Sequence, residues 1–175
     1  MDAIRFIVDT LLWLLMLAFL LRLLLQLVRA DFRDPMADAI VRLTNWMILP
    51  LRRVLPPVAK VDTATVVAVL ASAAARTAAQ FALLGLGIGA PLLFLRIMAI
   101  GLVDLVLRVY LFALLLYWLT SFTSPGGYGP GVRLLGQLCE PILKPVRRII
   151  PPIGAIDLSV LWVSIGIGAL LILLR

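Results

Sequence analysis

The chain has no histidine and only one cysteine, Cys139, among its 175 residues. Without histidine there is no Ser-His-Asp or Cys-His catalysis and no histidine-ligated zinc or haem. A single cysteine cannot form an internal disulfide. No nucleophile–base arrangement and no carboxylate pair on one apolar segment replaces these groups. We therefore expect no enzyme, no cofactor and no metal site.

Charge is also scarce: 14% of the residues are charged and 63% are hydrophobic. The mean hydropathy is +1.14. A soluble domain is about half apolar, so the bilayer is the expected solvent. The first apolar run, 4–28, is longer than the apolar core of a secretory signal and lacks its small-residue cleavage site. It predicts a retained transmembrane helix.

The hydropathy pattern predicts an all-α membrane protein with four transmembrane helices. The fourth is short for a hydrocarbon core of ~30 Å, which needs about 20 residues. Glycines and Pro91 after the second apolar run are expected to end or kink that helix. Alanines at every fourth position of the second run predict a close packing face. The four predicted spans are 4–28, 63–86, 97–120 and 158–174.

The first and third predicted spans are each followed by a loop with a predicted amphipathic helix, at 35–48 and 131–143. Asp34 is typical of an N-cap and Pro35 of a first helical position. We expect both helices to lie flat in the membrane interface. The apolar face of the first is predicted to hold Met36, Ile40, Leu43 and Met47, opposite Asp38, Arg42 and Asn45.

Two segments with nearly the same sequence indicate an internal repeat. "PLRRVLPP" at 50–57 returns as "PVRRIIPP" at 145–152, an offset that also aligns Asp9 with Asp104 and Asp62 with Asp157. Such periodicity is typical of duplicated architectures. We predict two parallel repeats, 1–95 and 96–175, each arranged as helix, interfacial amphipathic helix, helix.

The distribution of Lys and Arg predicts the orientation. The first long loop carries Arg29, Arg33, Arg42, Arg52, Arg53 and Lys60, and the other carries Arg133, Lys144, Arg147 and Arg148. The positive-inside rule places both loops in the cytoplasm. Both termini are then expected on the opposite side.

The four arginines of the repeated motif are candidate binding residues: Arg52, Arg53, Arg147 and Arg148. Flanking prolines would hold them at headgroup depth, and arginine can bind phosphate bidentately. The net charge of +7 thus favours anionic lipid or an acidic protein partner. Lacking a long basic segment with aromatics, the chain is not expected to contact nucleic acid. The alternative is that these arginines only set the topology.

Further polar residues stand at or within the predicted spans. Asp62 and Asp157 suit helix N-caps. Arg22 is near enough to a span end to snorkel to the surface. Arg76 is expected to pair with Asp9 or Asp104, either to fix helix packing or to line an ion or proton path. The predicted intramembrane charge network is Asp9, Arg76, Gln80, Asp104 and Arg108, with Asp104 and Arg108 as i,i+4 neighbours.

The pattern "DFRDP…PLRRVLPPVAKVD", repeated as "GP…CEPILKPVRRIIPPIGAID", resembles the YggT family of small bacterial membrane proteins, whose relatives include the YlmG-type proteins. The resemblance covers nearly the whole chain and implies a bacterial inner membrane location. It implies roles in osmotic adaptation or in the division and envelope machinery. Plastid relatives imply haem attachment to cytochrome b or nucleoid distribution. No catalytic residues carry over.

Two functions follow as hypotheses. The first is a non-enzymatic scaffold or assembly factor whose basic arms bind anionic lipid or a membrane protein partner. The second is a channel or transporter for ions or small osmolytes, which with four spans would require a homo-oligomer. A continuous water-accessible path lined by Arg76, Gln80 and Asp104 would favour the channel.

Overall fold

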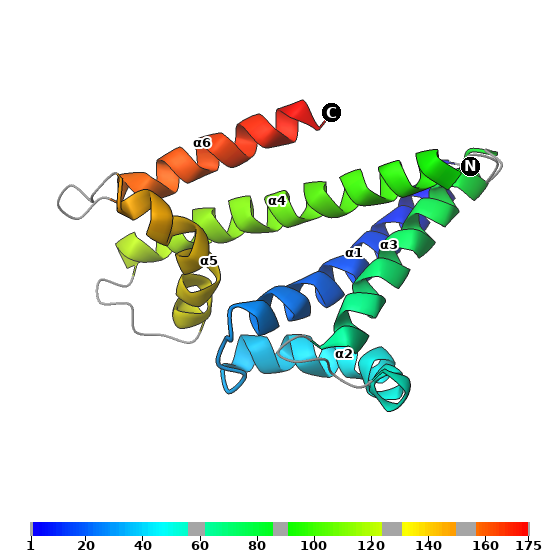
Figure 1. Ribbon diagram of the computed structural model, residues 1–175, viewed down its shortest axis with the longest axis horizontal. Helices are drawn as coiled ribbons and strands as arrows, with labels where there is room; N and C mark the ends of the chain where they lie inside the picture. The colour runs from blue at the N-terminus through cyan, green and yellow to red at the C-terminus, as the bar shows by residue number, and fades with distance from the viewer. Residues whose placement is uncertain (1, 56–61, 86–90, 124–130, 150–156, 175) are drawn as a thin grey trace. The chain divides into compact units, whose positions relative to one another are not determined.

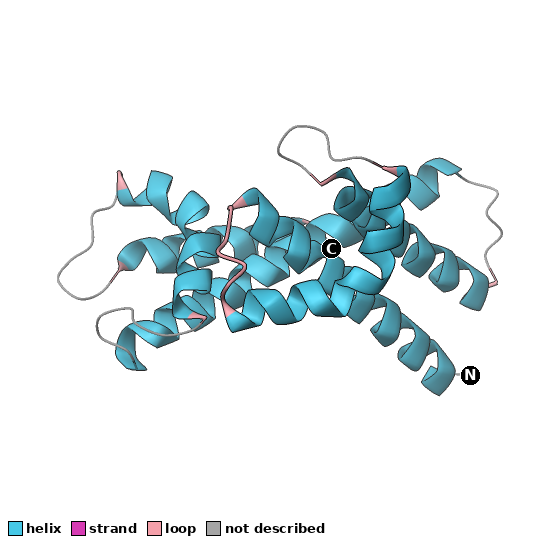
Figure 2. Cartoon of the chain, turned by 90° about the horizontal axis from the view of Figure 1, so that it is seen from below, coloured by secondary structure: helices cyan, strands magenta, loops and turns pink. Residues whose placement is uncertain are grey.

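The computed structural model describes residues 2–55, 62–85, 91–123, 131–149 and 157–174. Within these ranges the chain is helical and contains no strand (Figures 1 and 2). The prediction of an all-α protein is confirmed. The helices are α1 (Asp2–Leu27), α2 (Pro35–Val54), α3 (Thr63–Leu83), α4 (Pro91–Thr123), α5 (Val132–Arg147) and α6 (Leu158–Leu173).

Three of the described helices are long and apolar enough to cross a membrane: Ala3–Leu27, Thr63–Leu83 and Pro91–Thr120. They overlap the first three predicted spans, and the third begins at Pro91 rather than at residue 97. The fourth, α6, is apolar but has 16 residues. At 1.5 Å per residue it is about 24 Å long, against ~30 Å of hydrocarbon.

The break between α3 and α4 lies where glycine and proline predict it. Gly85 has a φ of +68°, a left-handed conformation that glycine adopts without the steric cost of a Cβ. Pro91 opens α4, where its missing N–H would have no partner within the helix. Gly87 and Gly89, also expected at this break, lie outside the described residues.

The chain forms two compact units. The first comprises Met1–Gln26 and Ala39–Val103, and the second comprises Leu27–Asp38 and Asp104–Arg175. These limits differ from 1–95 and 96–175 because α4 continues through residue 96 without a break. The connector after α1 belongs to the second unit, where the Asp31 N–H donates to Gln137 Oε1 at 3.2 Å.

In the first unit, α2 lies across the ends of α1 and α3 (Figure 1). Phe19 and Ile48 are fully buried against the small side chains of Ala64 and Ala68. Of the alanines at every fourth position of α3, Ala71 and Ala75 are exposed, as are neighbouring apolar side chains, so the contact within this unit uses another face of the helix. The helices approach through the alanines of the first two turns because α2 crosses at that end.

The surface helices run further than expected. α2 passes through Pro50 to Val54, and α5 passes through Pro141 and Pro145. A proline removes the bond to the carbonyl four residues earlier. For Pro50 that carbonyl belongs to Trp46, which is 66% exposed, so the freed carbonyl lies on the solvent-accessible side. The double prolines at 56–57 and 151–152 lie outside the described residues.

The inward face of α2 is not its most apolar face. Ala37, Thr44 and Ile48 are buried, whereas Leu43 is 65% exposed. The reason is a polar requirement inside the first unit, because the guanidinium of Arg22 on α1 takes its acceptors from this face of α2. The predicted apolar face thus lies largely outside the core, as expected of a helix that lies flat in the membrane interface, and that placement stays a prediction.

Candidate functional site

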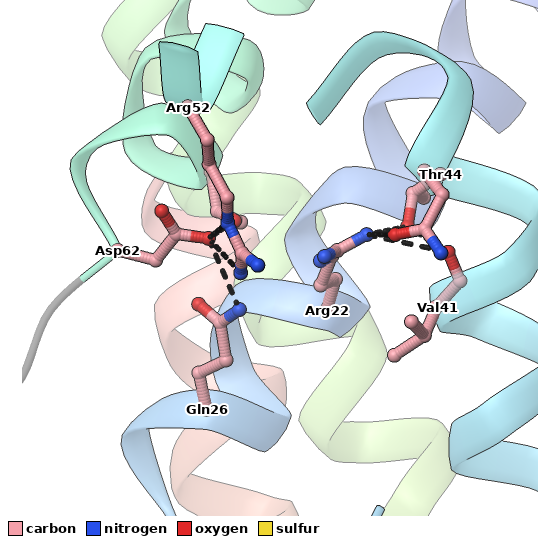
Figure 3. A network of polar contacts seen from close by, with 8 residues as sticks. Arg22, Gln26, Val41, Thr44, Arg52 and Asp62 are labelled. Atoms are coloured by element: carbon pink, nitrogen blue, oxygen red, sulfur yellow. Dashed lines mark hydrogen bonds and ion pairs between the residues drawn. The ribbon is translucent and has the colours of Figure 1, made fainter. Parts of the chain in front are cut away.

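The first arginine of the first motif is bound to an aspartate. Arg52 donates from Nε and Nη2 to Asp62 Oδ2 at 3.0 and 2.6 Å. The same oxygen accepts from Gln26 Nε2 at 3.4 Å (Figure 3), and it also accepts from Thr65 Oγ1 at 2.7 Å. This contact joins the last turn of α2 to the residue before α3.

Asp62 occupies the N-cap position of α3, as expected, but its side chain makes no cap bond to the backbone. The carboxylate serves the side chains of Arg52, Thr65 and Gln26 instead. Burial by itself raises the pKa of Asp62, and the hydrogen bonds from Arg52 and Thr65 outweigh it, so that this pKa lies below its ordinary value. Asp62 is thus held ionised, with only 9% of its surface exposed.

The second motif makes the equivalent contact. Arg147 donates from Nε and Nη2 to Asp157 Oδ2 at 2.8 and 2.6 Å. Its Nη1 donates to Glu140 Oε2 at 2.9 Å and its Nη2 to the Tyr117 hydroxyl at 3.3 Å. Asp157 Oδ1 also accepts from the Ser159 N–H at 3.0 Å. Asp157, unlike Asp62, therefore caps its helix through a backbone bond.

The environment of Arg147 is strongly stabilising for its charge. Burial acts to lower the pKa of Arg147, but the hydrogen bonds to Tyr117 and Asp157 raise it above its ordinary value. We call Arg52–Asp62 and Arg147–Asp157 the two Arg–Asp clamps. Each connects the end of a surface helix to the start of the next helix, ten residues further along the chain.

The clamps divide the four candidate arginines into two kinds. Arg52 and Arg147 each hold a carboxylate of the same unit. Arg53 and Arg148, the second arginine of each pair, have exposed side chains. The sequence does not distinguish the two arginines of each motif. Only the fold shows which one pairs with an aspartate.

Arg22 does not snorkel as expected. It is 2% exposed, and its Nη1 donates to Thr44 Oγ1 at 2.7 Å and to the Val41 carbonyl at 3.3 Å (Figure 3). The same nitrogen donates to Asn45 Oδ1 at 2.9 Å. α2 covers the end of α1 and blocks the route to the surface. The sequence feature that could have indicated this contact is the adjacent polar pair Thr44–Asn45 within a largely apolar helix.

Within the candidate spans of the first unit, Arg76 lies against Asp9. Arg76 Nε and Nη2 donate to the two oxygens of Asp9 at 2.9 and 3.0 Å, and Gln80 Nε2 donates to Asp9 Oδ1 at 2.8 Å. Arg76 and Asp9 form a bidentate ion pair, and Gln80 donates a third hydrogen bond to the same carboxylate. Asp9 is thus the carboxylate, of the two considered, that the structure joins to Arg76.

In the second unit, Asp104 is bound by Arg108 of the same helix. Arg108 Nε donates to Asp104 Oδ2 at 2.6 Å and Nη2 donates to Oδ1 at 2.9 Å. The side chains of Arg108 and Asp104 are 47% and 30% exposed. The predicted charge network therefore consists of two separate groups, each internally neutral: one of Asp9, Arg76 and Gln80, and one of Asp104 and Arg108.

Cys139 is fully buried on the inner face of α5. Burial raises the pKa of its thiol to about 12, which disfavours the reactive thiolate. Across the described ranges, no three side chains of the His, Cys, Asp or Glu type gather closely enough to hold a metal ion. The polar chemistry of the described residues is thus dominated by arginine–carboxylate pairs.

The sequence model of the CCB3/YggT family matches residues 1–83 and 97–175. An uncharacterized protein of Pseudomonas aeruginosa is 37% identical over 163 residues, covering 93% of this chain and 83% of the relative. A Vibrio alginolyticus protein encoded in the proC 3′ region is 35% identical over 95% of this chain and 90% of its own length.

The uncharacterized protein YggT of Escherichia coli K12 is 30% identical over 91% of this chain and 82% of its own length. None of these three names states an enzymatic activity. No solved structure matches this chain. Since the family match covers both arginine motifs and nearly all of the six helices, the chain belongs to the CCB3/YggT family.

Proposed function

We propose that this protein is a non-enzymatic scaffold or assembly factor of the bacterial inner membrane. Its exposed arginines, Arg53 and Arg148, present cations to anionic lipid headgroups. The observation that carries the proposal is the division within each arginine pair. One member is locked to an aspartate of its own unit, and the other faces outward at the same junction.

The clamps give the exposed arginines a defined position. In each unit the clamp joins the end of a surface helix to the start of the following apolar helix. An arginine next to the clamp lies at the height where a helix enters the membrane, which is headgroup depth. Each basic side chain at an anionic leaflet contributes about 1 kcal/mol of attraction. Two such sites per chain would set a preference rather than tight capture.

The outer face of α2 supports the same placement. Leu43, Trp46 and Leu49 are all more than half exposed. An exposed apolar stripe that includes tryptophan is typical of a helix lying in the membrane interface. Arg53 follows on the same helix, close to this stripe. The helix would thus bury apolar side chains at the acyl boundary while its basic end reaches phosphates.

The proposed topology follows from the charge distribution. Four spans, including the short α6, form two parallel repeats with both basic loops in the cytoplasm and both termini outside. A channel is the weaker proposal, because the two intramembrane carboxylates Asp9 and Asp104 are neutralised by Arg76 and Arg108. Such pairs serve helix packing without a water-filled path. Arginines at headgroup depth favour the lipid-binding scaffold instead.

The test compares two double variants of the full chain. Arg53→Ala/Arg148→Ala removes the exposed cations, and Arg52→Ala/Arg147→Ala removes the clamps. Both change the net charge equally, so each is the matched control of the other. After membrane insertion is confirmed, the proteins are purified in detergent. Retained phosphatidylglycerol and phosphatidylcholine are then compared by native mass spectrometry.

The two exposed arginines, Arg53 and Arg148, should determine the lipid preference. Two arginines at about 1 kcal/mol each predict a loss of roughly tenfold or more in the preference for phosphatidylglycerol. The clamp variant should lose mainly thermal stability. Equal lipid preference in wild type and Arg53→Ala/Arg148→Ala would contradict the proposal and direct the search to an acidic protein partner.

A further inference from the structure

The ion pair on α4 has an unusual position for a charged group. Asp104 and Arg108 lie about 20 Å and about 18 Å from the nearer ends of the candidate span Pro91–Thr120, at 1.5 Å per residue. A hydrocarbon core of ~30 Å places both near the bilayer centre. Neither side chain is long enough to reach a headgroup from there.

This ion pair is nevertheless exposed on the outside of its unit, with 47% of Arg108 and 30% of Asp104 accessible. The same face of α4 also exposes Phe112 and Leu115. Ionised side chains inside membranes face protein or water rather than lipid because desolvating them in hydrocarbon is costly. The pair therefore requires a cover that its own unit does not supply in the described residues.

Comparison of the repeats shows why the second unit differs. The residue equivalent to Asp104 is Asp9, which takes Arg76 and Gln80 from α3 across a helix–helix contact. The position equivalent to Arg76 is Leu171, so α6 offers no cation there. Asp104 is instead neutralised within its own helix, and the pair remains on the outer surface.

We infer that this face of α4 binds a second copy of the same chain, on the membrane-spanning arrangement of the proposed function. An aspartate and an arginine on one helix face are complementary to themselves. A two-fold axis along the membrane normal places α4 parallel to its copy. Asp104 of one chain then lies about one turn, ~6 Å along the axis, from Arg108 of the other.

The guanidinium has the capacity for this exchange. The bonds to Asp104 use Nε and Nη2, which leaves the two N–H groups of Nη1 to reach the partner's carboxylate. The two-fold axis produces this contact twice. Phe112 and Leu115 beside the pair provide apolar surface that closes the contact from lipid.

The test uses two differently tagged copies of the full chain expressed in one bacterial membrane. Asp104→Asn/Arg108→Gln removes both charges while keeping a polar side chain at each position. We expect the co-captured fraction to fall at least about tenfold, a change of 1.4 kcal/mol, with insertion and lipid preference unchanged. Asp104→Arg alone and Arg108→Asp alone should each fail to self-associate, whereas the two variants should capture one another.

Cross-linking locates the contact. Phe112→Cys and, as a control on α6, Leu161→Cys have similar exposure, and each is made in a Cys139→Ala background. Oxidation should join copies through Phe112→Cys but not through Leu161→Cys. Wild-type chains that do not capture one another, or an Asp104→Asn/Arg108→Gln variant that associates normally, would overturn the inference. The proposed lipid preference depends on Arg53 and Arg148, which these variants leave unchanged. The proposed scaffold function can therefore hold or fail independently of self-association.

Discussion

Arg52 and Arg53 are chemically identical neighbours with different environments. The sequence marks both as cations at a membrane junction, but the helix rotates adjacent side chains by about 100°, so only one can reach Asp62. A carboxylate at a helix entrance needs a cation nearby when its surroundings are apolar. Asp62 meets this need with Arg52 and leaves Arg53 outside.

Asp62→Asn tests the clamp at this scale. At pH 7 the change should lower the free energy of unfolding by about 2 kcal/mol, since it weakens hydrogen bonds to a charged acceptor. The lowered pKa of Asp62 means that the native carboxylate stabilises the fold above its unfolded pKa of about 4. That contribution disappears as the pH falls through the folded pKa.

Thermal unfolding in detergent between pH 7.5 and pH 3 measures this effect. The difference in stability between wild type and Asp62→Asn should be largest near neutral pH. It should shrink as the pH falls below about 4. Asp31→Asn, at an exposed carboxylate, is the control and should change stability little at any pH. A gap for Asp62→Asn that stays constant down to pH 3 would contradict the clamp's electrostatic role.

At the scale of elements, Asp34 serves two helix ends. Its Oδ1 accepts from the Met36 N–H at 2.9 Å and its Oδ2 from the Gly131 N–H at 2.9 Å. Gly131 has a φ of +83° and provides no side chain to cap α5. The N-cap residue of α5 is therefore held through its own N–H by the connector after α1. The N-cap of α2 was predictable, whereas the second bond was not.

Asp34→Ala should weaken the first turns of both α2 and α5. The expected loss is about 1–2 kcal/mol, the usual range for a lost N-cap. Asp34→Asn keeps one carbonyl oxygen and should lose less. Amide hydrogen exchange, resolved to the first turns of the two helices, measures the effect. Unchanged exchange at the start of α5 in Asp34→Ala would show that the Gly131 bond does not stabilise that helix.

The two surface helices also differ as elements. α5 buries Leu134, Leu138 and Leu143 and exposes its polar face. α2 buries Thr44 beside Ile48 and exposes Leu43 and Trp46. The two helices therefore turn different kinds of side chain inward. The difference arises because Arg22 draws polar acceptors of α2 inward.

At the scale of the whole molecule, the proposed topology depends on α6. With 16 residues, it crosses a bilayer only if the membrane thins locally or flanking residues lie at the interface. If α6 crosses, its far end lies on the same side as the start of α1. If it does not, the two repeats are not topologically equivalent.

Single-cysteine variants in a Cys139→Ala background decide this point. An impermeant maleimide added to spheroplasts should label Ala3→Cys and Leu173→Cys, both at exposed positions. Arg33→Cys and Arg133→Cys in the basic loops should be labelled only after permeabilisation. Labelling of Leu173→Cys together with the loop cysteines would place the end of α6 in the cytoplasm and remove the fourth span.

Much of the architecture could be predicted from local signals. Apolar length located the helices of the first three spans, and the motif spacing placed both arginine pairs at equivalent junctions. Glycine and proline marked the break after α3. These features depend on residues close together in the sequence, whose hydropathy and backbone preferences act before any tertiary contact forms.

The sequence by itself determined that this chain is helical, apolar and internally repeated. Only the tertiary structure decided that Arg52 is paired while Arg53 is exposed, that Arg22 is buried, and that Arg76 meets Asp9. The physical reason is that a long cationic side chain can reach many acceptors. Which acceptor it meets depends on how helices distant in sequence approach one another, and hydropathy does not record that approach.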